Sequence, residues 1–76
     1  MEQIELSQLI VEKRKLFGFT QKELANKAGV GLRFIRELEM GKPTLQMNKV
    51  NQVLMLFGFE LGAVLLNRNN ILNEKS

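Results

Sequence analysis

The sequence contains no cysteine, no histidine and no aspartate, and it has a single proline. Without cysteine there is no disulfide framework and no thiolate metal site. Histidine is the commonest metal ligand and a frequent general base, so its absence argues against metal-dependent and triad chemistry. Glu37 and Glu39 stand two residues apart on a predicted helix and therefore point in different directions. We expect no cofactor, no metal site and no enzymatic activity.

Long apolar runs are also missing. No stretch approaches the roughly 18 consecutive apolar residues that a membrane span requires. The acidic start Met1-Glu2 lacks the basic region of a signal peptide. We therefore expect a cytoplasmic protein with no membrane partner.

The size and charge of the chain point to a small protein with partners. A chain of 76 residues is long enough for one domain. A domain this short buries only roughly 60% of the surface that its unfolded chain exposes, so a second chain is expected to help stabilise it. Eleven Lys and Arg against eight Glu give a net charge of +3. This charge is compatible with a polyanionic partner and equally with an ordinary solvated surface.

Apolar residues at helical spacing predict four helices. The expected ranges are about 7–17, 21–28, 31–40 and 45–57, and each range is followed closely by a glycine. The second helix has the clearest start, because Thr20 and Glu23 have the spacing of a capping box. These helices account for most of the first 58 residues.

Residues 59–66 read FELGAVLL and are followed by the polar run 67–70. We predict a strand here, and the alternative is a short fifth helix over 61–66. A single strand in a helical chain leaves its backbone groups unpaired, and the same strand of a second chain is the simplest partner. A homodimer is therefore expected. The predicted interface residues are Phe59, Leu61, Ala63, Val64 and Leu65.

The second and third predicted helices carry the spacing of a helix-turn-helix. The inward positions of that motif are all apolar: Leu24, Ala28, Val30, Ile35 and Leu38. Ala25 is small enough for two helices to cross closely, and Gly29 can adopt the positive φ that a tight interhelical turn requires. This coincidence favours a helix-turn-helix over a generic helical hairpin.

Residues 10–61 resemble the Cro/cI-type helix-turn-helix domain, and in particular its HipB-type antitoxin branch. The resemblance rests on FGFTQKELA at 17–25, FIRELEMGKPT at 34–44 and FGFEL at 57–61. It implies a mainly α fold of four to five helices, similar to lambda repressor, with a short C-terminal strand that pairs across a dimer. The expected domain covers residues 1–66, and residues 67–76 are expected to form a flexible tail.

The outer face of the third helix is the expected DNA-reading surface, because this face of a helix-turn-helix enters the major groove. Arg33 suits a bidentate contact to guanine, and Leu32 could meet a thymine methyl group. Glu37 could accept from a cytosine amino group or instead orient Arg33 through an i,i+4 pair. The predicted base-reading residues are Gly31, Leu32, Arg33, Arg36 and Glu37, with Met40 on the same face. For each of them the alternative is an ordinary solvated side chain.

Contacts to the DNA backbone are expected around the two ends of this motif. Gln21 stands at the start of the second helix, where free amides also favour phosphate, and Lys42 and Thr44 follow the third helix. Lys49 could add a further phosphate contact. The resemblance implies a phosphate-clamping role for Gln21.

The resemblance also assigns structural roles to two residues, and for one of them, Arg14, the alternative is a contact to DNA. Arg14 and Glu39 fall where related domains join the first helix to the end of the third by an ion pair. Phe34 is expected to pack over the helix-turn-helix, since an aromatic ring on a groove face would need a special role such as intercalation.

Three functions stay open at this stage. The resemblance favours a DNA-binding repressor of its own operon that acts as the antitoxin of a HipA-like Ser/Thr kinase toxin, alone or with a third small subunit. The second possibility is a stand-alone transcriptional regulator without a toxin. The third is a protein-binding adaptor that uses the helix-turn-helix surface, and strong salt dependence of DNA binding would count against it.

Overall fold

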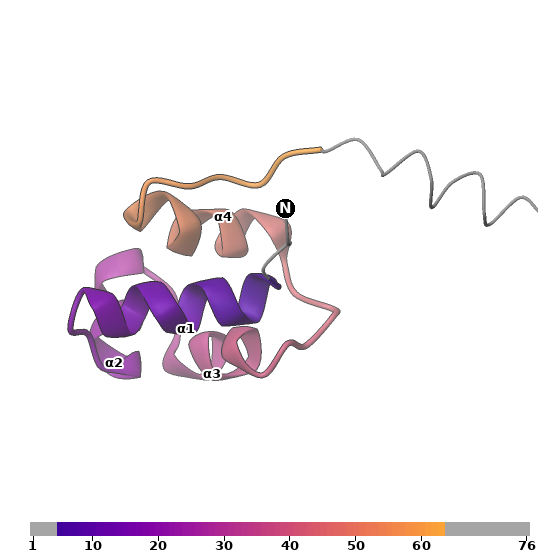
Figure 1. The fold of residues 1–76 in the computed structure, drawn as a ribbon. Coiled ribbons are helices and arrows are strands. Elements are labelled where there is room, and N and C mark those ends of the chain that lie inside the picture. Colours follow the sequence, from indigo (N-terminus) through magenta and orange to yellow (C-terminus); the bar gives the residue numbers. More distant parts are fainter. Residues whose placement is uncertain (1–4, 64–76) are drawn as a thin grey trace, which may run out of the picture.

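The computed structural model describes residues 5–63 and contains four helices in that part of the chain, with no strand. They are α1 (Leu6–Leu16), α2 (Gln21–Ala28), α3 (Leu32–Glu39) and α4 (Met47–Leu56) (Figure 1). The mainly helical prediction is confirmed: α2 has the expected ends, and the ends of the other three helices differ from the expected ones by one or two residues. None of the helices in this range is long and apolar enough to cross a membrane.

The α2–turn–α3 unit forms from local signals. The Thr20 hydroxyl accepts from the Glu23 amide at 3.1 Å, and the Glu23 carboxylate accepts from the Thr20 amide at 2.8 Å, so the predicted capping box is present. Gly29 ends α2 in the left-handed region with a φ of 74°. The Val30 amide then donates to the Ala25 carbonyl at 3.0 Å and closes the turn. These bonds fix the direction in which the chain enters α3.

One core joins the four helices. Its buried residues are Ile10, Leu24, Ala25, Ile35, Leu38, Val50, Val53 and Leu54. Three of the predicted inward residues are thus fully buried, whereas Ala28 and Val30 are partly buried against the core. α3 packs against α1 and α2, and α4 packs against α2. Because α3 is held through Ile35 and Leu38, the rest of its surface is turned outward.

The apolar stripes of α1 and α4 extend past this core. Leu16 is 73% exposed, Phe17 51% and Met47 72%. Phe17 lies beside Phe57 with the ring centroids 5.1 Å apart, and the two rings meet edge to face. Apolar residues at helical spacing therefore identify an apolar face of a helix, but they do not show whether that face is buried within this chain.

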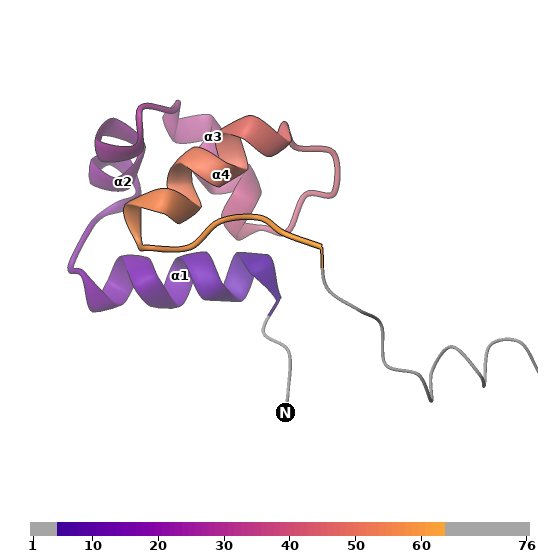
Figure 2. The ribbon, with the colours of Figure 1, turned by 90° about the horizontal axis from the view of Figure 1, so that it is seen from above.

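Residues 59–63 leave the end of α4 and run back along it, on the side away from α3 (Figure 1). Seen from above, this segment also runs alongside α1, in the opposite direction (Figure 2). The Leu61 amide donates to Asn51 Oδ1 at 2.8 Å, and Lys13 Nζ lies 5.5 Å from the centre of the Phe59 ring. Residues 59–63 form neither a strand nor a helix within the chain. The rest of the predicted strand or fifth helix, residues 64–66, and the predicted tail, residues 67–76, lie outside the described residues.

Candidate nucleic-acid interface

The outer face of α3 carries the residues expected to read bases. Arg33 projects from the first turn with a side chain that is 91% exposed, and Arg36 is exposed one turn later. Gly31 is the exposed N-cap residue of α3 and makes no side-chain cap. Leu32 is partly buried against the core, so less of its side chain is free for a thymine methyl than the sequence suggested. The side chains of Arg33 and Arg36 are thus both accessible on the outside of α3.

Glu37 links two predicted DNA contacts. Its Oε2 lies 3.7 Å from Arg33 Nε and 2.9 Å from Lys42 Nζ. The hydrogen bond from Lys42, followed by the charges of Lys42 and Arg33, lowers the pKa of Glu37 below its ordinary value. The pair with Arg33 was expected from the i,i+4 spacing. The hydrogen bond from the Lys42 side chain was not expected. It depends on the turn after α3, in which the Lys42 backbone amide donates to the Glu37 carbonyl at 3.1 Å.

The ion pair between Arg14 and Glu39 is present, as the resemblance implied. Arg14 Nε lies 2.6 Å from Glu39 Oε2, and Arg14 Nη2 donates to Glu39 Oε1 at 3.2 Å. The two side chains are 16% and 8% exposed. Arg14 Nη1 also donates to the Phe19 carbonyl at 3.0 Å, so α1 holds both the end of α3 and the loop before α2. Phe34 packs partly buried against the core, as predicted.

The predicted phosphate contacts occupy different environments. Thr44 and Lys49 are exposed, and the Lys42 side chain is 44% exposed beside Glu37. Gln21 is half-buried, and its Nε2 donates to Glu39 Oε1 at 3.0 Å. Sequence reasoning missed this bond, because the two residues are 18 positions apart and no local pattern connects them.

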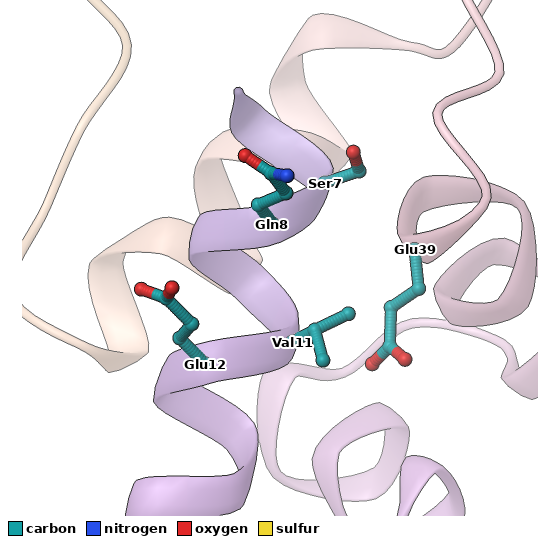
Figure 3. A pocket seen from close by; sticks show the side chains of 5 residues that line it. All are labelled: Ser7, Gln8, Val11, Glu12 and Glu39. Atoms are coloured by element: carbon teal, nitrogen blue, oxygen red, sulfur yellow. The ribbon is translucent and has the colours of Figure 1, made fainter. Parts of the chain in front are cut away.

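A shallow hollow lies between α1 and the end of α3. Its volume is about 280 Å³, and it is lined by Ser7, Gln8, Val11, Glu12 and Glu39 (Figure 3). Figure 3 shows Glu39 reaching from the end of α3 toward α1. The hollow is open to solvent and two of its five lining residues are glutamates, so it lacks the enclosure of a small-molecule site.

The predicted dimerisation residues that the structure describes stand on segment 59–63, which runs on the side of α4 away from α3 (Figure 1). Phe59 is 40% exposed, Leu61 37%, and Ala63 is also exposed. Val64 and Leu65 are outside the described residues. Phe17 lies close by through its contact with Phe57, which only Gly58 separates from segment 59–63. We refer to Phe17, Phe57, Phe59 and Leu61 as the C-terminal apolar surface.

Comparison with known proteins agrees with this geometry. A family model described as helix-turn-helix matches residues 10–63, from the middle of α1 to the end of the described segment. The chain is 60% identical over 45 residues to a protein of Sinorhizobium fredii (strain NBRC 101917 / NGR234) that is named as an uncharacterized HTH-type transcriptional regulator, y4mF. The aligned region covers 59% of each chain, so this chain matches about three fifths of the length of that relative.

Proposed function

The chain belongs to the Cro/cI-type helix-turn-helix family, and from this premise we propose that it is a transcriptional repressor that binds double-stranded DNA sequence-specifically. One observation carries the proposal. Ile35 and Leu38 fix α3 on the core, while Arg33 and Arg36 remain on its outer face. A helix held in this way presents its first turns to base edges in the major groove.

On DNA, the cations held by Glu37 would exchange partners. Arg33 leaves Glu37 to donate to guanine O6 and N7, and Lys42 moves to a phosphate oxygen. Exposed ion pairs of this kind contribute little to stability because solvent screens them, so exchanging them for DNA contacts costs little. Gln21, Thr44 and Lys49 add backbone contacts that set the position of α3 without selecting a sequence.

The protein acts as a homodimer in this proposal. One domain makes few phosphate contacts and would bind weakly, because sequence-independent affinity grows with the counterions released. Segment 59–63, which carries Phe59 and Leu61 of the C-terminal apolar surface, runs on the side of α4 away from α3 (Figure 1), so a second copy can cover it and leave both reading helices free. Two such helices fit half-sites about 34–36 Å apart, and the operator is then a pseudo-palindrome.

The narrower part of the proposal is an antitoxin role. The resemblance of segments 17–25, 34–44 and 57–61 to HipB-type proteins supports it, together with the extended course of residues 59–63. In that role the chain represses its own operon and binds a HipA-like Ser/Thr kinase toxin, alone or with a third small subunit. A stand-alone regulator uses the same DNA-binding surface without this partner.

Binding to a duplex from the protein's own promoter tests the main proposal. Fluorescence anisotropy should give an affinity at least about 10³ times higher than for a scrambled duplex, and log K should fall linearly with log salt concentration. Equal affinity for both duplexes would refute sequence-specific repression, and salt-independent binding would instead favour the protein-binding adaptor.

A second experiment separates the antitoxin from the stand-alone regulator. The chain is co-expressed with any kinase-like protein encoded beside its gene, and the mixture is passed over a size-exclusion column. Co-elution of the two proteins is expected for an antitoxin. Separate elution, or the lack of such a neighbouring gene, would leave the stand-alone regulator.

A further inference from the structure

Glu39 carries more hydrogen bonds than its bracing role requires. Its nearly buried carboxylate accepts from Arg14 Nε and Nη2 and also from Gln21 Nε2. Arg14 comes from α1, Gln21 from the first turn of α2, and Glu39 from the last turn of α3. The Arg14 pair alone would join α1 to α3, so the bond to Gln21 calls for a separate explanation.

We propose that Glu39 is a positioning residue that holds the Gln21 carboxamide ready for a DNA phosphate. The inference rests on the proposed DNA binding and deepens it. An ionised carboxylate only accepts hydrogen bonds, so the NH₂ group of Gln21 has to face Glu39 and its Oε1 has to face elsewhere. One N–H of that group is used at 3.0 Å, and the second remains to donate to a phosphate oxygen. Without Glu39 the carboxamide rotates, and in half of its orientations it presents an oxygen where the donor is needed.

Arg14 makes this arrangement compatible with DNA. A lone carboxylate beside a phosphate contact would repel the DNA backbone, and the two-point pair with Arg14 offsets that charge. Arg14 also binds the Phe19 carbonyl, one residue before the Thr20 cap of α2. The start of α2 and the end of α3 are therefore held by the same guanidinium, which couples the position of Gln21 to that of the reading helix.

A double-mutant cycle tests the proposal on the full chain. Gln21→Ala is measured in three backgrounds: the parent, Arg14→Met with Glu39→Met, and Glu39→Gln. The double substitution Arg14→Met with Glu39→Met, referred to as the Met pair, removes the acceptor for Gln21 and leaves no unpaired charge. Replacing a buried ion pair by apolar residues of similar volume is often tolerated. Glu39→Gln is the background that keeps an acceptor, since its new side-chain carbonyl can still accept from Gln21, and it differs from the Met pair in leaving Arg14 without an anionic partner. Thermal melting followed by circular dichroism shows which variants fold.

We expect the loss of operator affinity caused by Gln21→Ala to depend on the presence of an acceptor at position 39. Gln21→Ala should raise the Kd for the operator duplex about tenfold in the parent and in Glu39→Gln, but less than about twofold in the Met pair. The same loss in all three backgrounds would overturn the positioning role, and so would no loss in a parent chain that binds the operator. A parent chain that does not bind its operator would refute the proposed function itself.

Nuclear magnetic resonance gives a second readout that needs no stable variant. In the DNA-free parent chain, one Nε2 proton of Gln21 should be shifted downfield and exchange slowly with water, because it is bonded to a carboxylate. Two Nε2 protons that resemble those of the exposed Gln46 would overturn the proposal even if the Met pair did not fold.

Discussion

Individual side chains around α3 are expected to differ in what they contribute to DNA binding. Arg33 is free to reach base edges, whereas Lys42 lies in the loop beyond the end of α3. Arg33→Ala should weaken operator binding by roughly 1–3 kcal/mol and relax the preference at one base pair. Lys42→Ala should weaken all sequences similarly and lower the salt slope by about one. Competition with operators altered at single base pairs measures both effects.

The ion pairs of Glu37 affect how this comparison is read. Either substitution leaves Glu37 with one cation instead of two, so both variants share that change. A difference between them in base preference therefore reports the base contact of Arg33, because the loss of either ion pair does not depend on the DNA sequence. Equal and sequence-independent losses would remove Arg33 from base reading.

Among the helices, α2 depends most clearly on a titratable cap. The hydrogen bond from the Thr20 amide, followed by that with its hydroxyl, lowers the pKa of Glu23 below its ordinary value. The stabilisation is therefore fully present above the unfolded pKa of about 4.3 and is lost as the pH falls through the lower folded value. Glu23→Gln should flatten the decline in unfolding free energy below about pH 4.3.

Urea unfolding at a series of pH values and at one protein concentration measures this decline. Glu12→Gln is the control, because Glu12 is exposed on α1 and belongs to no capping box. An unchanged pH profile for Glu23→Gln would show that the cap does not stabilise the folded chain.

The turn between α2 and α3 makes a different prediction. A Cβ at Gly29 would lie 3.6 Å from Gln52 Nε2, which is an ordinary contact, so space is available. The backbone there has a φ of 74°, which an L-residue with a side chain adopts at a cost. Gly29→Ala should lower the free energy of unfolding by about 1 kcal/mol, and Gly29→Asn should cost less because Asn tolerates this region better. Equal stability of the parent and Gly29→Ala in urea would contradict the prediction.

The capping box and the glycine turn could be predicted because each depends on residues close together in the chain. The buried positions Ile35 and Leu38 followed from helical spacing for the same reason. The bond between Gln21 and Glu39 could not be predicted, since it needs the final packing of α2 against α3. The exposure of Phe17 could not be predicted either, because apolar residues have the same helical spacing on a face buried in the core and on a face that a partner covers.

For the whole molecule, the arrangement of surfaces favours a dimer. Segment 59–63 of the C-terminal apolar surface runs on the side of α4 away from α3 (Figure 1), so a second copy bound to this segment does not compete with DNA bound to α3. Residues 59–63 are held to α4 by the bond from the Leu61 amide to Asn51 and by that from the Phe59 amide to the Leu54 carbonyl. The segment is thus set in place while Leu61 stays 37% exposed. This is the arrangement expected of a segment that is ordered before a second copy pairs with it.

A charge placed on this surface should separate the copies. Leu61→Glu puts two carboxylates into the proposed interface, where their burial is costly, so the dimer should dissociate while the helical content is kept. Losing the second reading helix should weaken operator binding at least about 100-fold. Sedimentation velocity and anisotropy measure the two effects.

Met47→Glu is the matched control, since Met47 is 72% exposed at the start of α4 and lies outside the C-terminal apolar surface. The Met47→Glu protein should stay dimeric. A Leu61→Glu protein that stays dimeric would place the interface elsewhere on the molecule.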